Sequence, residues 1–156
     1  MSFTIRSAEE ADVPHIIDMG ERFFSASKWS SSIATFDRES FKATVQRMMT
    51  PPDVGGGLIL YAESKGRPAG MVGVVCFPCY FNLNIIFAQE LFLWAEPEHR
   101  GHLGPQLLDA IELICGDLGV QVMICGSISG LKDKLVGELY ARRGYRPSES
   151  SFIKAL

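Results

Sequence analysis

The stretch Leu93–Leu108 reads LWAEPEHRGHLGPQLL and joins an apolar, strand-like segment to a helix through a turn with two glycines. Gly101 and Gly104 allow backbone to approach a ligand closely. The first N–H groups of a helix lack intrahelical partners and attract anions. This pattern predicts a cradle for a diphosphate, although any strand-to-helix turn also favours a glycine and a polar residue. The helix is expected from Pro105, on the apolar set Leu107, Leu108, Ile111, Ile114 and Leu118.

Working outward, hydrophobic periodicity predicts one mixed α/β domain over residues 1–156. Ser7 with Glu10 is typical of a capping box, Asp37 of an N-cap, and Gly144 of a helix end. The predicted order is strand, two helices, three strands, helix, strand, helix, strand. Strands are expected at 2–7, 58–64, 69–77, 87–95, 120–125 and 151–156, and helices at about 8–25, 37–50, 105–118 and 131–142.

Composition excludes several classes of protein. The formal net charge is −3 without a long basic run, which argues against nucleic-acid binding. No stretch is apolar enough to span a bilayer, and the N-terminal residues lack the apolar core of a secretory signal. The four cysteines are therefore expected to be reduced thiols in a cytoplasmic protein. Cys76 and Cys79 have the spacing of a redox pair, but they end a strand-like run, so buried structural thiols are favoured over a redox or zinc site.

Three segments together resemble the GNAT family of N-acetyltransferases. PEHRGHLGPQLL (97–108) is similar to the family's signature turn, GELYARRGYRPSESSFIKAL (137–156) to its C-terminal helix and last strand, and FTIRSAEEADVPHI (3–16) to its opening. The resemblance implies an α/β (α+β) GNAT acyl-CoA N-acyltransferase fold, with a mixed central sheet flanked by about four helices. It also implies transfer of acetyl from acetyl-CoA to a primary amine by direct attack in a ternary complex. A small-molecule amine is favoured as acceptor. The alternative is a non-catalytic acyl-CoA-binding sensor or scaffold.

The resemblance places the coenzyme along the same stretch. The backbone of Leu93, Trp94 and Ala95 would pair with the pantetheine arm of acetyl-CoA. The turn departs from the family pattern: counted from Arg100, Gly104 is fifth and Pro105 sixth, one residue short, and Pro105 has no N–H. Asp133 stands where the family often has an asparagine contacting the coenzyme, and it is also suited to capping a helix. The diphosphate contacts are expected from Arg100, Gly101, His102, Leu103, Gly104, Pro105 and Gln106.

Two residues are candidates for the chemistry. Tyr140 matches the family tyrosine that protonates the departing sulfur, and it also suits a core position with its hydroxyl at the rim. Glu90 resembles the carboxylate that some members use as general base, and it also suits a solvated strand position. Strict alternation would place Glu90 on one face with Phe92 and Trp94, opposite Leu93.

Aromatic residues mark two further regions. Trp29 and Phe36 lie in a serine-rich segment that covers the acceptor pocket in the family, so they could form an aromatic wall or simply pack on the core. The apolar segment 79–87, CYFNLNIIF, could flank the acceptor site or form the interface of a homodimer. No metal site is expected.

Overall fold

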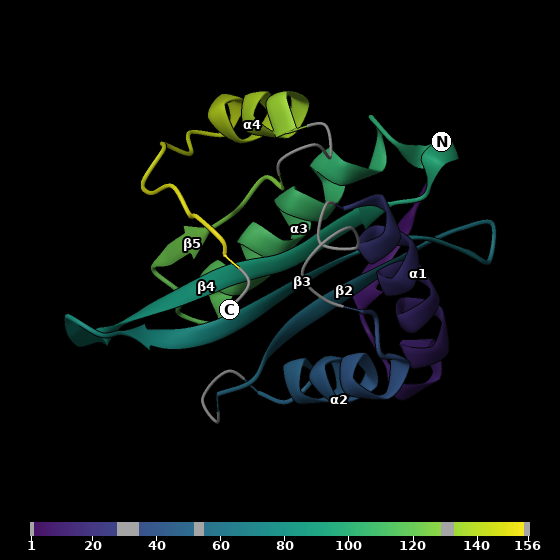
Figure 1. Cartoon of the computed structure of the whole chain (residues 1–156), viewed down its shortest axis with the longest axis horizontal. Coiled ribbons are helices and arrows are strands. Elements are labelled where there is room, and N and C mark those ends of the chain that lie inside the picture. Colours follow the sequence, from purple (N-terminus) through teal and green to yellow (C-terminus); the bar gives the residue numbers. More distant parts are fainter. Residues whose placement is uncertain (1, 28–34, 52–54, 129–132, 155–156) are drawn as a thin grey trace.

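The computed structural model describes residues 2–27, 35–51, 55–128 and 133–154, and these form one five-stranded sheet with helices on both faces (Figure 1). The strands follow one another in chain order across the sheet, and all neighbours are antiparallel except the last pair, β4 and β5. The strands are β1 (Thr4–Ser7), β2 (Gly57–Ser64), β3 (Arg67–Cys79), β4 (Asn82–Ala95) and β5 (Val122–Ile124), and the α-helices are α1 (Val13–Ala26), α2 (Arg38–Met48), α3 (Leu103–Asp117) and α4 (Asp133–Arg142).

Side-chain alternation along the strands divides the interior into two clusters. On β2, Leu60 and Ala62 face the cluster built with α3, whereas Ile59 and Tyr61 face the cluster built with α1 and α2. This is the period-2 pattern of a sheet buried on both faces. The two helix layers therefore pack on opposite faces, and any group on the sheet belongs to one layer or the other.

β4 is irregular in a way that matters for the site. Its ladder with β3 pairs Phe92 with Gly73 and Glu90 with Val74, so Leu91 is an extra residue in a β-bulge. A bulge shifts the alternation of side chains by one position along its strand. Residues before and after Leu91 are therefore out of phase with each other.

The sheet confirms most of the predicted order and corrects its last element. Residues 151–154 form no strand, and Phe152 is almost fully exposed. The alternation of that tail is local, whereas a strand needs a neighbour with free N–H and C=O groups. The capping box also differs, since the N–H of Glu9 donates to Asp12 Oδ2 at 2.8 Å instead of Ser7 pairing with Glu10. The predicted caps are confirmed at Asp37, which accepts from Ser40 N, and at Gly144, which has φ 83°.

An ion pair fixes the entry to α1. Arg6 donates from both terminal nitrogens to Asp12, at 2.6 and 2.9 Å, and lies over the ring of Tyr61. Asp12 is buried, so its charge depends on this bidentate partner. The hydrogen bonds from Arg6 hold the pKa of Asp12 below its ordinary value, against the opposing effect of burial.

We predict that Asp12→Asn destabilises the protein in a pH-dependent way. The lowered pKa stabilises the folded state above the unfolded value of about 4, and this contribution is lost as the pH falls through the folded value. The free energy of unfolding in urea should fall by roughly 1–3 kcal/mol at pH 7, with a smaller difference at pH 3. Glu149→Gln, on the exposed tail, serves as control. Equal losses at both pH values would contradict the role of the ion pair.

Candidate functional site

The backbone of β4 loses one of its two neighbours halfway along. β5 pairs only with Phe87, Ala88 and Gln89, while β3 continues to pair as far as Ala95. Beyond Gln89, no residue of β4 is paired with a residue of β5 along this outer edge. An extended ligand can add to such an edge as a strand does. The predicted pantetheine contacts, Leu93 to Ala95, lie in this half, although the Ala95 carbonyl already accepts from Arg100 Nε at 3.2 Å.

The turn after β4 leads into the start of α3. A 3-10 turn, η4 (Pro97–His99), is followed by Gly101 with φ 87°, a backbone conformation that favours glycine. No atom lies within 4 Å of where a Cβ would stand on Gly101 or Gly104. The side chain of His102 makes no capping hydrogen bond to the helix. The N–H of His102 donates to the His99 carbonyl at 3.3 Å, whereas the first N–H groups of α3 have no acceptor within the helix. The turn is therefore open above its glycines and beside these helical N–H groups, as a diphosphate cradle requires.

The helix begins two residues earlier than the sequence indicated. α3 starts at Leu103, so Pro105 is its third residue instead of its first. Proline is tolerated here because a third-position N–H would have no intrahelical acceptor. The amides of Leu103 and Gly104 take the first two positions, and Gln106 bonds back through its side chain to the His102 carbonyl. The shortened turn is thus accommodated by an earlier helix start.

Cations lie around this turn. Arg100 is exposed and its guanidinium stands 4.7 Å from the ring centroid of Trp94. Arg143, which the sequence did not single out, donates to the Pro105 carbonyl at 3.0 Å and to Asp109 at 2.9 Å. It connects the residues just after α4 to the first turn of α3. Its only sequence signal was the double arginine in LYARRGY.

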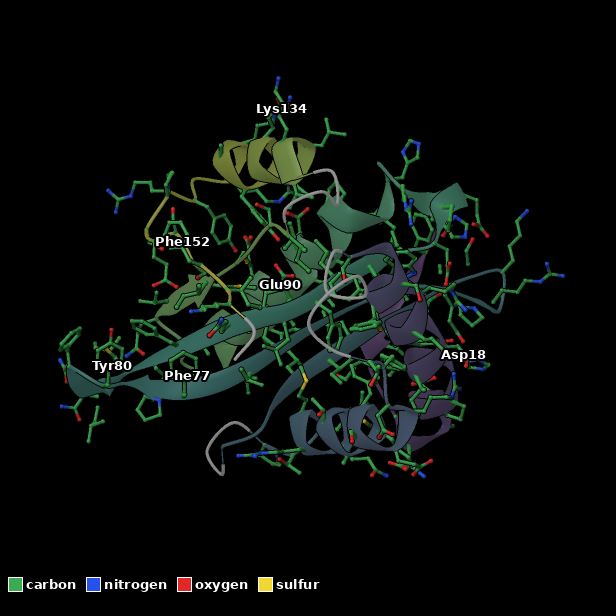
Figure 2. All side chains as sticks on the ribbon, viewed as in Figure 1. Asp18, Phe77, Tyr80, Glu90, Lys134 and Phe152 are labelled. Carbon is green, nitrogen blue, oxygen red and sulfur yellow. The ribbon has the colours of Figure 1, made fainter. Side chains whose placement is uncertain are left out.

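Glu90 and Tyr140 meet directly. Tyr140 extends from α4, is 7% exposed, and its hydroxyl donates to Glu90 Oε2 at 2.5 Å. The same hydroxyl lies 3.3 Å from the Gly126 carbonyl, just beyond β5. Figure 2 shows Glu90 near the middle of the sheet. The two candidates are 50 residues apart in sequence and become one hydrogen-bonded pair in the fold.

The bulge explains which face Glu90 occupies. Tyr140 belongs to the cluster that contains α3 residues and Leu93, whereas Phe92 and Trp94 belong to the cluster of α1 and α2. Glu90 therefore lies on the face of Leu93. The grouping of Glu90 with Phe92 and Trp94 was wrong, because strict alternation does not survive the extra residue Leu91.

The pair sits in a low-dielectric environment. Burial raises the pKa of Glu90 to about 7, and hydrogen bonds from Tyr140, Gly126 and Cys125 only partly oppose it. Burial and the nearby carboxylate raise the pKa of Tyr140 above its ordinary value. Burial raises the pKa of Cys125 to about 12, so this thiol stays protonated. Beyond it, Tyr145 donates to Glu112 Oε1 at 2.8 Å.

The remaining predicted residues are dispersed. Phe36 packs between Phe24 and Phe41, with ring centroids 5.7 and 5.3 Å away, at the margin of the core under α1 and α2. Asp133 is the first residue of α4, and its side chain lies outside the described part of the chain, as does the whole of Trp29. The four cysteines are free thiols; Cys76 and Cys115 are buried, and Cys79 and Cys125 are half-buried.

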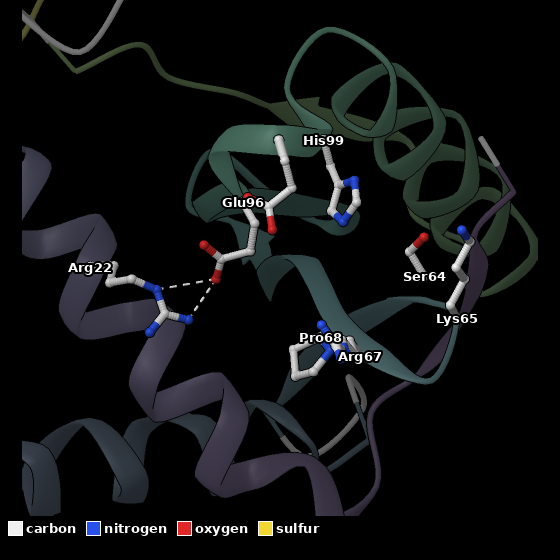
Figure 3. A pocket seen from close by; sticks show the side chains of 8 residues that line it. Arg22, Ser64, Lys65, Arg67, Pro68, Glu96 and His99 are labelled. Carbon is white, nitrogen blue, oxygen red and sulfur yellow. Dashed lines mark hydrogen bonds and ion pairs between the residues drawn. The ribbon is translucent and has the colours of Figure 1, made fainter.

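A cavity of about 760 Å³ lies beside the segment that leads into the cradle (Figure 3). Arg22 of α1 donates to Glu96 Oε1 from Nε at 3.1 Å and from Nη2 at 2.5 Å. Glu96 is 9% exposed, so this pair holds a buried carboxylate at the end of β4. Lys65 and His99 also line the cavity. The ion pair therefore anchors the start of the turn to α1.

The described residues lack two features of other classes of protein. They contain no group of three or more His, Cys, Asp or Glu side chains placed to hold a metal ion. Within the same ranges, no helix has the length and apolar character needed to cross a membrane.

Comparison with solved structures shows what the fold is. Over the whole of both chains, the protein aligns with a ribosomal-protein-alanine N-acetyltransferase from Brucella melitensis biovar Abortus 2308 (14% identity, TM-score 0.76, 100% of each chain). It also aligns with a predicted acetyltransferase from Clostridium acetobutylicum, solved with acetyl-CoA (12% identity, TM-score 0.76, 99% of this chain and 96% of that one). A third match is an aminoglycoside acetyltransferase from an uncultured soil metagenomic sample, in complex with sisomicin (13% identity, TM-score 0.73, 99% and 96%).

The chain therefore has the GNAT acetyltransferase fold, as its sequence resemblance implied. No family model and no curated protein matches the sequence. At 12 to 14% identity the fold is shared while the acceptor is free to differ.

We predict that Glu90→Gln changes how stability depends on pH. The pKa of Glu90 is raised to about 7, so stability is fully present below the unfolded value near 4 and is lost as the pH rises through 7. Relative to wild type, Glu90→Gln should gain roughly 2–3 kcal/mol in free energy of unfolding between pH 5 and pH 8. The control is Glu112→Gln, which removes another carboxylate that accepts a hydrogen bond from a tyrosine, Tyr145. If the free energies of unfolding of wild type and Glu90→Gln change with pH in parallel, the raised pKa of Glu90 is refuted.

Proposed function

We propose that the protein is an N-acetyltransferase that moves acetyl from acetyl-CoA to a primary amine of a small molecule in the cytoplasm, with residues 1–156 acting as one domain. The observation that carries this proposal is the bonded pair of Glu90 and Tyr140 beside the half of β4 that β5 does not cover. A base and an acid are what acyl transfer to an amine requires. The pair, the open turn and the fold all favour the same reaction.

The chain offers a fitting place for acetyl-CoA. The uncovered edge at Leu93–Ala95 suits the pantetheine arm, and the N–H groups of Leu103 and Gly104 at the start of α3 suit the diphosphate. The N–H of His102 already donates to the His99 carbonyl at 3.3 Å, and Gln106 is the fourth residue of α3, where the N–H bonds within the helix. Arg100 and Arg143 add positive charge near that turn. When bound, acetyl-CoA supplies the thioester carbonyl that the amine attacks. The Clostridium acetobutylicum structure, which holds acetyl-CoA on the same fold, supports this assignment.

Glu90 and Tyr140 divide the proton chemistry. A carboxyl with pKa about 7 is partly ionised at neutral pH, so Glu90 can accept a proton from the amine and later release it. The phenol of Tyr140 is protonated at that pH because its pKa is raised, and it can serve as the acid for the leaving sulfur. Both roles depend on partial exclusion of water, since Tyr140 is buried and Glu90 is half-buried.

We favour a small amine as the acceptor. The second cavity, of about 510 Å³, is lined by Trp94, Pro97, Asp18 and Glu21 and lies on the α1 face of the sheet, opposite Glu90, so we do not assign the acceptor to it. The structural neighbour in complex with sisomicin, an aminoglycoside acetyltransferase, supports this class. Trp29 and Phe36 remain predicted acceptor contacts, and Asp133 a predicted coenzyme contact.

We predict that acetyl-CoA stabilises the protein and that the start of α3 is responsible. A ligand at about 100 times its Kd adds roughly 2.7 kcal/mol, which should raise Tm by about 5–10 °C. Gly104→Asp places a carboxylate where the turn is open, so it should weaken binding at least tenfold. The matched control, Gly116→Asp, stands in the same helix with equally open surroundings and should bind as wild type.

Release of free CoA across a panel of amines then separates the enzyme from the alternative sensor or scaffold. The proline in the first turn of α3, which removes one N–H, is the feature that favours the alternative. A rise in Tm with no release of CoA for any amine would support the sensor. No rise in Tm at millimolar acetyl-CoA would overturn both assignments.

We also propose that the protein is a homodimer joined through the tip of the β3–β4 hairpin. Tyr80, Phe81 and Leu83 at that tip are 79%, 85% and 70% exposed. Figure 2 labels Tyr80 at the end of the hairpin. The hairpin extends past Val75, which pairs with Gly57 at the start of β2, and past Phe87, which pairs with Val122 at the start of β5. A bare two-stranded ribbon with large apolar side chains is marginal in water. Residues 76–87 contain no charged side chain, so two copies can meet without like-charge repulsion.

We predict that sedimentation velocity will find wild type as a dimer at micromolar concentration. Replacing Tyr80, Phe81 and Leu83 together by serine should yield a monomer. Acetyl-CoA should raise the Tm of this variant as much as it raises the Tm of wild type. The control replaces Phe152 and Ile153 by serine; these residues are as apolar and also exposed, but lie on the C-terminal tail. A monomeric wild type at the same concentration would contradict the interface.

A further inference from the structure

We infer that Glu90 and Tyr140 form a single proton path, in which the proton that Glu90 takes from the amine is passed to Tyr140 while Tyr140 gives its own proton to the leaving sulfur. This inference rests on the proposed acetyl transfer and deepens it. In the simpler picture, a base and an acid would act separately on the two sides of the reacting carbonyl. Their direct contact makes one proton transfer depend on the other.

The geometry determines the order of events. A phenol has one hydrogen, and Tyr140 donates it to Glu90 Oε2 at 2.5 Å. That hydrogen cannot bond to sulfur while it is held by an ionised Glu90. Once Glu90 is protonated it becomes the donor, and the Tyr140 hydroxyl can accept from it and turn its own hydrogen outward. The acid is therefore released only after the base has acted.

Electrostatics act in the same direction. The charge of Glu90 is one cause of the raised pKa of Tyr140, after burial itself. Neutralising Glu90 removes that charge and strengthens the phenol as an acid at the moment the thiolate forms. The two other residues that bond to the pair carry no charge, because the Cys125 thiol is protonated and Gly126 contributes only its backbone. Tyr145 and Glu112 lie one bond further away, beyond Cys125.

The path balances. The amine nitrogen forms a C–N bond with the acetyl carbon, the C–S bond breaks, and the electron pair of that bond goes to sulfur. The N–H proton goes to Glu90, the Glu90 proton to Tyr140 Oη, and the Tyr140 proton to sulfur. The products are an amide and a thiol, and both side chains return to their starting protonation states. No oxidant, reductant or further base is needed.

The first test uses the free protein and needs no turnover. Isotope-edited infrared spectroscopy of carbon-13-labelled glutamate can follow the protonation of Glu90 against pH, with Glu90→Gln identifying its band. Tyr140→Phe keeps the ring but removes a hydrogen bond that lowers the pKa of Glu90, so the titration should move to higher pH. Tyr145→Phe removes a phenol from the same cluster that bonds to Glu112, and it should move the titration much less. An unchanged Glu90 titration in Tyr140→Phe would overturn the pairing.

The second test compares Glu90→Gln, Tyr140→Phe and the double variant in CoA release with the best amine. General acid or base catalysis is worth about 10²- to 10⁴-fold, so each single variant should lose that much in kcat. If one path links them, the double variant should be no slower than the slower single variant, within about threefold. Losses that multiply would overturn the path and leave the acetyl transfer standing. No turnover by wild type with any amine would overturn the proposed function and the path with it.

Discussion

The antiparallel ladder between β3 and β4 runs from Gly70 opposite Ala95 to Cys79 opposite Asn82, and the other elements take their places from it. β2 continues the sheet on one side along the first part of β3, and β5 continues it on the other along only three residues of β4. Because β5 is so short, the second half of β4 keeps an uncovered edge. That edge leads through a turn into α3, so a strand edge and a helix start face the same region.

One extra residue in this ladder decides the chemistry of the site. The bulge at Leu91 moves Glu90 to the face where α3 and α4 pack, while Phe92 and Trp94 fill the opposite layer. On that face Glu90 meets a tyrosine from α4 and is half-buried. Burial raises its pKa into the neutral range, where a carboxyl can both accept and release a proton. The same burial would be unfavourable without the hydroxyl of Tyr140.

Ion pairs hold the segments around this region in place. Arg6 with Asp12 fixes the entry to α1, and Arg22 with Glu96 joins α1 to the end of β4. Arg143 bonds the first turn of α3 to the segment after α4. Each interaction joins two segments that lie apart in the sequence or run in different directions in the fold. Together they set the positions of the strand edge, the turn and the tyrosine relative to one another.

The sequence by itself determined the element order as far as α4 and the glycine turn before α3, because these depend on local periodicity and caps, and its resemblance to the GNAT family indicated the fold. It also named Glu90 and Tyr140, through resemblance. It did not determine that they touch, that Arg143 reaches α3, or that residues 151–154 form no strand. Those facts depend on strand register and helix packing, which involve residues far apart in the chain. The bulge at Leu91 is the clearest case, because the sequence of β4 alone cannot reveal that Leu91 has no paired residue in β3.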